Sequence, residues 1–149
     1  MQDGTARDRW SPATSASFWI NRASRALLRV QEARLRPLGL GMGYLPVLHA
    51  LQERKAMSQK DLAARAEVEQ PTMAAILSRM ERDGVVQREP DPNDRRASLV
   101  TLTRLAYARF PKAKEQLIEA EEIATAGFTE KEKELLRTLL ERVVKNLDK

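Results

Sequence analysis

The sequence contains no cysteine and a single histidine, His49. Without cysteine, the chain forms no disulfide, has no thiol redox switch and offers no thiolate to a metal ion. One histidine alone cannot supply a metal site of the His/Cys type. We therefore expect no metal and no other cofactor.

Long apolar runs and catalytic motifs are also missing. No apolar run reaches the roughly 20 residues that a membrane-spanning helix needs. The first ten residues, MQDGTARDRW, are polar and lack the apolar segment of a signal peptide. The chain has no glycine-rich phosphate loop, no nucleophile paired with a base and no acidic cluster at metal spacing. These absences predict a cytoplasmic protein that is not an enzyme and has no membrane partner.

The composition fits one domain. The chain has 149 residues, of which 42% are hydrophobic and 32% charged, and its net charge is +5. A basic balance points toward a polyanion but does not establish one. Between Gln70 and Arg104, six arginines stand against five acidic residues. A nucleic-acid function must therefore rest on where the arginines lie rather than on local charge excess.

Apolar residues recur at helical spacing along most of the chain. Ser11 and Pro12 predict a helix start, and the helix that follows ends near Arg36. We expect further helices over 44–55, over 59–66 with Ser58 and Asp61 as a capping box, and from Pro71 to Asp83. Two more follow Thr103 and Thr129, and the last has a wide leucine-rich face that a monomer would expose. Arginines 22, 25 and 29 fall on the side of the first helix opposite its apolar residues, where a solvated face is the simplest interpretation.

The stretch REPDPNDRRASLVTLT predicts a β-hairpin with a charged tip. Val and Thr on either side favour extended backbone. Pro90 and Pro92 lack a backbone N–H and suit a loop rather than a strand interior. A solvated tip and a ligand-contacting tip are both compatible with this pattern.

The order of elements is that of a helix-turn-helix followed by a wing. The second helix of such a unit enters the DNA major groove, and arginines of the hairpin can enter the adjacent minor groove. Gln70 and Thr72 could instead only cap the helix, and Glu81 or Asp83 could instead pair with its arginines. Asp94 could hold an arginine in its fork geometry. The candidate DNA-binding residues are Gln70, Pro71, Thr72, Ala75, Ser78, Arg79, Arg82, Asp94, Arg95 and Arg96.

Three stretches resemble the MarR (multiple-antibiotic-resistance regulator) family of winged helix-turn-helix repressors. DPNDRRASLVTLT is similar to the family's wing, LSRMERDGVVQRE to the end of its recognition helix, and GFTEKE to the turn before its last helix. The resemblance implies a homodimeric repressor on a pseudo-palindromic operator. It also assigns Arg96 to the minor groove, Asp94 to its support and Arg95 to a basic wing position.

The expected fold is mainly α, with a small two-stranded β wing. Residues 1–149 form a single MarR-like domain, in which 12–36 and 104–147 are dimerisation helices and 44–103 form the winged helix-turn-helix lobe. The resemblance also implies a small effector, aromatic or anionic in character, that lowers DNA affinity. GMGYLP departs from the family's usual sequence beside the ligand pocket, so the effector's identity does not carry over. Candidate ligand-binding residues are Trp19, Tyr44, His49, Tyr107 and Phe110, with core packing or dimer contact as the alternative for each. We expect His49 to be hydrogen-bonded and half-buried rather than a sensor.

Two other functions remain compatible with the sequence. A winged-helix module could bind a protein partner and leave DNA alone. An architectural protein could instead bind any duplex equally. For the protein-binding module, removal of Arg96 would leave the activity unchanged. The architectural protein would bind a scrambled duplex as tightly as any other duplex.

Overall fold

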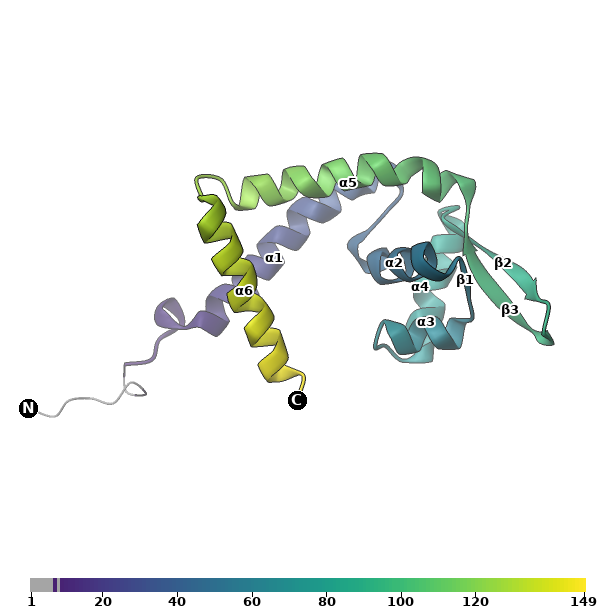
Figure 1. Cartoon of the computed structure of the whole chain (residues 1–149), viewed down its shortest axis with the longest axis horizontal. Helices are drawn as coiled ribbons and strands as arrows, with labels where there is room; N and C mark the ends of the chain where they lie inside the picture. Colours follow the sequence, from purple (N-terminus) through teal and green to yellow (C-terminus); the bar gives the residue numbers. More distant parts are fainter. Residues whose placement is uncertain (1–6, 8) are drawn as a thin grey trace, which may run out of the picture.

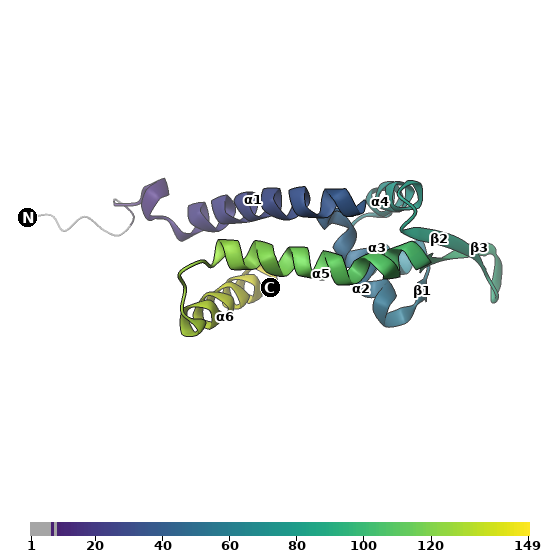
Figure 2. The ribbon, with the colours of Figure 1, turned by 90° about the horizontal axis from the view of Figure 1, so that it is seen from above.

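Helices dominate the part of the chain that the structure, a computed structural model, describes: Arg7 and residues 9–149. Most of the polar N-terminal stretch therefore lies outside the described residues. Two long helices, α1 (Ala16–Leu35) and α5 (Arg104–Ala124), run side by side (Figures 1 and 2). A lobe of shorter elements lies at one end of this pair. The fold is the mainly helical one that the sequence predicts, with a small antiparallel sheet.

The first long helix begins later than the Ser11-Pro12 signal suggests. Pro12–Thr14 forms a single turn of 3₁₀ helix (η1), and Ser11 caps that turn. The α-helix starts only at Ala16, where the Ser15 hydroxyl accepts a hydrogen bond from the Phe18 N–H. Ser11 and Ser15 each stand at the N-cap of a helical segment, which explains why the earlier one looked like the start of α1.

Three short helices build the lobe: α2 (Leu45–Arg54), α3 (Gln59–Arg65) and α4 (Gln70–Arg82). The Ser58 hydroxyl accepts from the Asp61 N–H at 3.1 Å, the first of the two bonds expected of a capping box. Gly84 ends α4 with a φ of 73°, a left-handed conformation that glycine adopts without steric cost. The predicted core face of α4 is confirmed: Ile76 is partly buried, and three residues are fully buried, Met73, Leu77 and Met80.

The sheet has three strands rather than the two predicted. Strands β2 (Val86–Asp91) and β3 (Asp94–Leu102) form the hairpin, and β1 (Ala56–Met57) pairs with the other side of β3. The prediction that Pro90 lies in a loop is wrong, because it pairs with Ser98 inside β2. The strand order β1-β3-β2 leaves β2 at an edge, where one side of the backbone makes no ladder and a proline is tolerated.

Two helices follow the sheet. The Thr103 hydroxyl caps α5 by accepting from the Ala106 N–H, and it donates to the Gly84 carbonyl at 2.5 Å. Helix α5 continues through Pro111 and ends at Ala124. The predicted capping box of Thr129 and Glu132 forms and starts α6 (Glu130–Leu147), which folds back at an angle to α5 (Figure 2). None of the helices in the described ranges is long and apolar enough to cross a membrane.

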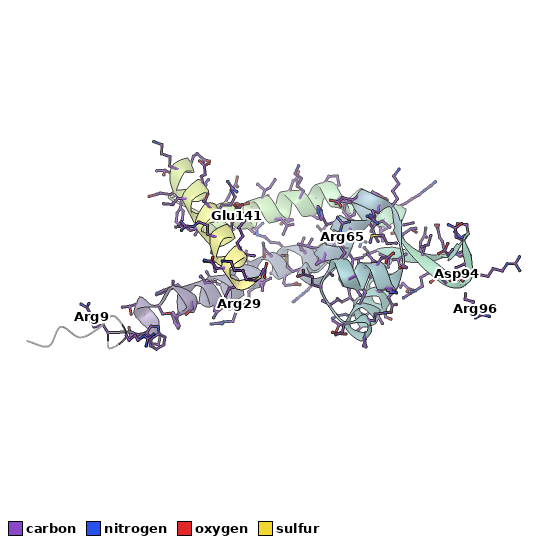
Figure 3. All side chains as sticks on the ribbon, turned by 60° about the horizontal axis from the view of Figure 1, so that its bottom comes forward. Arg9, Arg29, Arg65, Asp94, Arg96 and Glu141 are labelled. Atoms are coloured by element: carbon purple, nitrogen blue, oxygen red, sulfur yellow. The ribbon has the colours of Figure 1, made fainter. Side chains whose placement is uncertain are left out.

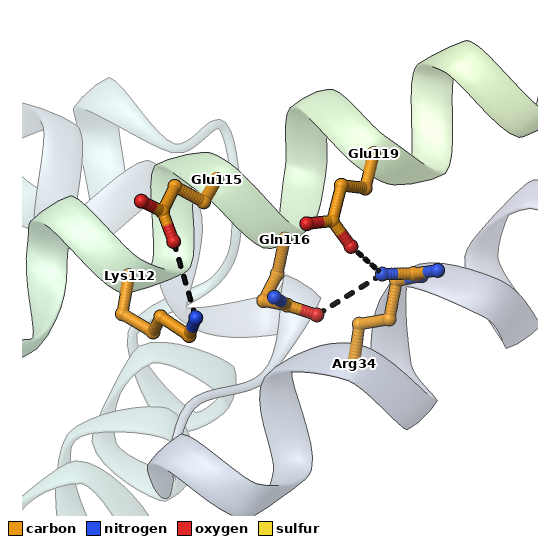
Figure 4. Close-up of polar contacts among 5 residues, drawn as sticks. All are labelled: Arg34, Lys112, Glu115, Gln116 and Glu119. Carbon is orange, nitrogen blue, oxygen red and sulfur yellow. Dashed lines mark hydrogen bonds and ion pairs between the residues drawn. The ribbon is translucent and has the colours of Figure 1, made fainter.

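Polar contacts as well as apolar packing join α1 to α5. The Arg34 Nη1 atom lies 2.5 Å from the Glu119 carboxylate and 3.1 Å from the Gln116 side-chain oxygen (Figure 4). On the same stretch of α5, the Lys112 ammonium pairs with Glu115 at 3.2 Å. Arg34 thus ties α1 to α5, and the pair of long helices carries the lobe at one end (Figures 1 and 2).

Candidate nucleic-acid interface

One face of α4 is exposed and lined by small or polar side chains. Helical spacing buries Met73, Leu77 and Met80 and turns the other face outward. Short side chains on the outward face would let the helix backbone come close to a duplex. All of the candidate residues on α4 are exposed: Gln70, Pro71, Thr72, Ala75, Ser78, Arg79 and Arg82.

The N-terminal end of α4 is not closed by a side chain. Glu69 occupies the N-cap position, and no side chain accepts a hydrogen bond there. The alternative that Gln70 or Thr72 only caps the helix therefore loses its support. Free N–H groups at a helix start attract phosphate, so these two side chains lie beside a suitable anion site.

At the wing tip, Asp94 bonds to the backbone and not, as expected, to an arginine side chain. Asp94 Oδ1 accepts a hydrogen bond from the Arg96 backbone N–H at 2.9 Å, and Asp91 accepts from the Asn93 N–H at 2.8 Å. Asp94 thus fixes the backbone of the turn instead of holding a guanidinium. Among the described residues, no ion pair involves Arg95 or Arg96, which are both exposed; Figure 3 shows Arg96 projecting from the tip.

A bridge that the sequence analysis missed connects the wing to α4. The Arg88 Nε atom, on β2, lies 2.6 Å from Glu81 Oε1 on α4. Its Nη2 atom is 3.4 Å from the side-chain oxygen of Gln59 on α3. Arg88 therefore links three elements of the lobe, and among the described residues Glu81 forms an ion pair with Arg88 and with neither Arg79 nor Arg82. Only the hairpin's fold creates this pairing, so helical periodicity gave no sign of it.

The C-terminal end of α4 has a partly buried hydrogen bond to Tyr44. The Tyr44 hydroxyl donates to Asp83 Oδ2 at 2.6 Å, and Arg82 Nε lies 3.7 Å from the other carboxylate oxygen. Burial is the main cause that raises the pKa of Tyr44 to about 12, and the bond to Asp83 adds to it. The positive charges of Arg79 and Arg82 act in the opposite direction on this pKa, so both arginines lie near the pair.

The five candidate ligand-binding residues lie in different parts of the described chain. Trp19 is 52% exposed, and its indole N–H donates to the Ala13 carbonyl. It lies roughly 24 Å along α1 from Leu35, where the chain turns toward Tyr44. Two surface hollows, of about 410 Å³ and about 480 Å³, are lined by α6 residues and by α1 residues, and none of the five lines either.

The remaining ligand candidates occupy different surroundings. The expectation of a half-buried His49 is wrong: its side chain is 72% exposed and lies 3.3 Å from Glu53, one turn along α2. Tyr107 and Phe110 pack edge to face on α5, with ring centroids 5.5 Å apart. The Tyr44 side chain is buried, and its hydroxyl donates to Asp83. The alternative of core packing fits Tyr44 and Phe110, which contribute to the core of the lobe.

The last helix exposes the apolar face that the sequence predicts. No residue of α6 is buried within the chain. Apolar residues of α1 and α5 are exposed too, among them Leu28, Ile118 and Ile123. On α6 it comprises Leu135, Leu136, Leu139, Leu140, Val144 and Leu147.

A helix-turn-helix with an outward-facing second helix, followed by a wing, defines a winged helix-turn-helix protein. In the described part of the chain, no group of three His, Asp or Glu side chains could hold a metal ion. Residues 42–98, which span the lobe, match the model of the MarR family. The chain is also 35% identical over 126 residues to the homoprotocatechuate degradative operon repressor of Escherichia coli, covering 80% of this chain and 85% of that protein. This chain therefore belongs to the MarR family, a family of transcriptional regulators rather than enzymes.

Solved structures agree with this fold. A mutant MarR from Escherichia coli, crystallised with operator DNA, superposes with a TM-score of 0.74 at 24% identity, covering 85% of this chain and 91% of that one. The organohalide-sensing regulator RdhR, in its 2,4-dichlorophenol-bound form, gives a TM-score of 0.79 at 22% identity over 98% of this chain and 87% of that one. Both confirm the winged-helix architecture.

Proposed function

We propose that this chain is a cytoplasmic repressor that binds a pseudo-palindromic DNA operator as a homodimer. The observation that carries the proposal is the combination of an exposed, short-chained α4 face with Arg95 and Arg96 at the wing tip, which form no ion pair with any described residue. The short, exposed side chains of α4 let this helix enter a major groove. Arg95 and Arg96 carry the positive charge that favours entry into a minor groove. The operator complex of the similar Escherichia coli MarR supports this arrangement.

The homodimer joins residues 12–36 and 104–147 of two copies, and residues 44–103 form each DNA-binding lobe. The exposed leucines of α6 support this division, because a contiguous apolar face of that kind is unfavourable in water. Two lobes related by a two-fold axis fit a palindromic site, since operator symmetry mirrors protein symmetry.

A small aromatic or anionic effector lowers the affinity of the dimer for its operator. The dichlorophenol-bound regulator of similar fold supports an aromatic effector. Such a ligand acts only through a difference in its affinity for the DNA-binding and non-binding states. Fluorescence anisotropy of the DNA-bound dimer against a panel of phenols and aromatic acids tests this step, and a panel with no effect contradicts it.

The central proposal is tested by selection from a pool of duplexes randomised over 20 base pairs. We expect enrichment of a two-fold symmetric sequence, bound about 10³-fold or more tightly than its scrambled version. Binding should weaken steeply as the salt concentration rises. Arginines that bind phosphates release the cations condensed there, and this release is less favourable when the solution already holds many cations. Equal binding to every duplex would indicate an architectural protein, and no binding at low salt would favour a protein partner instead.

A further inference from the structure

The Tyr44 hydroxyl, at the end of a largely buried side chain, lies where the two parts of the chain meet. Tyr44 ends a 3₁₀ turn, η3 (Met42–Tyr44), directly before α2. This turn is fixed to α1, because the Glu32 carboxylate accepts a hydrogen bond from the Met42 N–H at 2.6 Å. The preceding turn is held by α5, since Arg109 Nη1 donates to the Leu38 carbonyl at 2.6 Å. Tyr44 therefore projects from a segment anchored to both long helices.

At its other end, Tyr44 reaches the C-terminus of α4. Its hydroxyl donates to one Asp83 oxygen at 2.6 Å, while Arg82 Nε lies 3.7 Å from the other oxygen. Only 8% of Tyr44 is exposed, so the donor has a fixed position, whereas the Arg82 side chain is 72% exposed. The carboxylate thus joins a fixed group to a solvated guanidinium on the outward face.

Helix stability does not account for an aspartate at this position. A negative charge at a helix C-terminus is unfavourable, because the last carbonyls carry partial negative charge. Asp83 is the C-cap of α4, where a neutral or basic residue would stabilise the helix better. Its contacts with Tyr44 and Arg82 offer a reason for an acid here, since one carboxylate oxygen accepts from the Tyr44 hydroxyl and the other lies within ion-pair distance of the Arg82 guanidinium.

We propose that Tyr44 and Asp83 are positioning residues that hold the Arg82 guanidinium in the direction it needs on DNA. The inference rests on the proposed function and deepens it, because it assigns the orientation of one recognition-helix arginine to a buried tyrosine 38 positions away in the sequence. Neither Tyr44 nor Asp83 touches DNA in this account. The hydroxyl limits where the carboxylate can lie, and the carboxylate limits where Arg82 can lie.

A double-mutant cycle tests the inference on the duplex enriched by the wild-type protein. Tyr44→Phe, Arg82→Ala and the double variant are compared with wild type by anisotropy, at matched salt and pH. We expect Tyr44→Phe to weaken specific binding about three- to tenfold, in the lower part of the range typical of coupled groups in one network. In the Arg82→Ala background, Tyr44→Phe should have no effect on affinity. Asp83→Asn, which retains an acceptor for Tyr44 but loses the charge that faces Arg82, should behave like Tyr44→Phe.

A merely structural role for Tyr44 gives a different pattern. In that case Tyr44→Phe weakens binding equally with and without Arg82, and this result overturns the inference. An unchanged affinity of Tyr44→Phe in the wild-type background also overturns it. If the wild-type protein enriches no duplex, the proposed function fails first and the inference fails with it. Urea unfolding of each variant confirms that the compared proteins are folded at the assay temperature.

Discussion

The Arg88 guanidinium on the wing lies 2.6 Å from the Glu81 carboxylate on the recognition helix. The two parts of the proposed DNA interface are therefore tied to each other by an ion pair that faces solvent only in part. An exposed pair of this kind contributes little to stability, typically about 0.2–1 kcal/mol. Its effect on the angle between wing and helix is the more consequential one, because both must fit adjacent grooves of one duplex.

Glu81→Gln separates the two effects of this ion pair. The substitution removes a negative charge, which alone should strengthen non-specific DNA binding. Because the neutral amide can hold Arg88 only by a weaker, uncharged hydrogen bond, the wing is less firmly fixed to α4, and we expect operator affinity to fall by up to about 1 kcal/mol. Anisotropy on the enriched and scrambled duplexes measures both. A rise in affinity for both duplexes would show that the bridge has no positioning role.

Ala75→Leu tests the close approach of the α4 surface. Ala75 is exposed at the centre of the short-chained face, and leucine is a good helix former. The free energy of unfolding should change by less than about 0.5 kcal/mol, while operator affinity should fall by more than about 1.4 kcal/mol, or tenfold. Ala108→Leu, at an exposed position of α5, is the matched control and should alter neither quantity. Undiminished operator affinity of Ala75→Leu would argue that α4 does not enter a groove.

The raised pKa of Tyr44 predicts a loss of stability at high pH. An unfolded chain ionises its tyrosines near pH 10, whereas the folded protein keeps Tyr44 protonated up to about pH 12. The unfolded state therefore binds fewer protons above pH 10, and the free energy of unfolding falls as the pH rises from 10 to 12. Wild type should lose about 2 kcal/mol more than Tyr44→Phe over this range. Urea unfolding at pH 9 and pH 11.5 measures the difference, and parallel losses in the two proteins would contradict it.

Leu140→Glu tests the α6 surface as the interface between two copies. A charge placed in a buried apolar interface is costly, so we expect the dimer to dissociate at micromolar concentration, as measured by analytical ultracentrifugation. Operator affinity should then fall at least tenfold, because each copy holds only one half-site. Lys131→Glu, an exposed substitution at the start of α6, should leave the dimer intact. A Leu140→Glu protein that sediments like wild type would place the interface elsewhere.

Local patterns predicted most of the DNA-binding lobe. Met73, Leu77 and Met80 recur at helical spacing, and Thr103 and Thr129 are caps, so each reveals its element within a few residues. Strand β1 was missed because Ala56 and Met57 are too few to show alternation. Pro90 was wrongly placed in a loop because only an edge strand tolerates a proline. Whether β2 is an edge strand depends on the strand order, which a single stretch of sequence does not reveal.

Long-range side-chain contacts could not be predicted from the sequence. The Tyr44–Asp83 bond joins residues 39 positions apart, and the Arg88–Gln59 contact joins residues 29 apart. Neither spacing has a periodic signature. His49 was expected to be half-buried because histidine is often so, yet its position on α2 faces away from Leu48 and Leu51, which are buried.

The most direct test of the account compares wild type with Arg96→Ala on the enriched duplex and on its scrambled version, at several salt concentrations. Lys112→Ala, which removes one exposed charge from α5, controls for net charge. The account predicts that Arg96→Ala loses about 1–3 kcal/mol of operator affinity and that its salt dependence becomes shallower by about one ion, while Lys112→Ala binds like wild type. Equal operator affinity of wild type and Arg96→Ala at every salt concentration would contradict a wing that enters the minor groove.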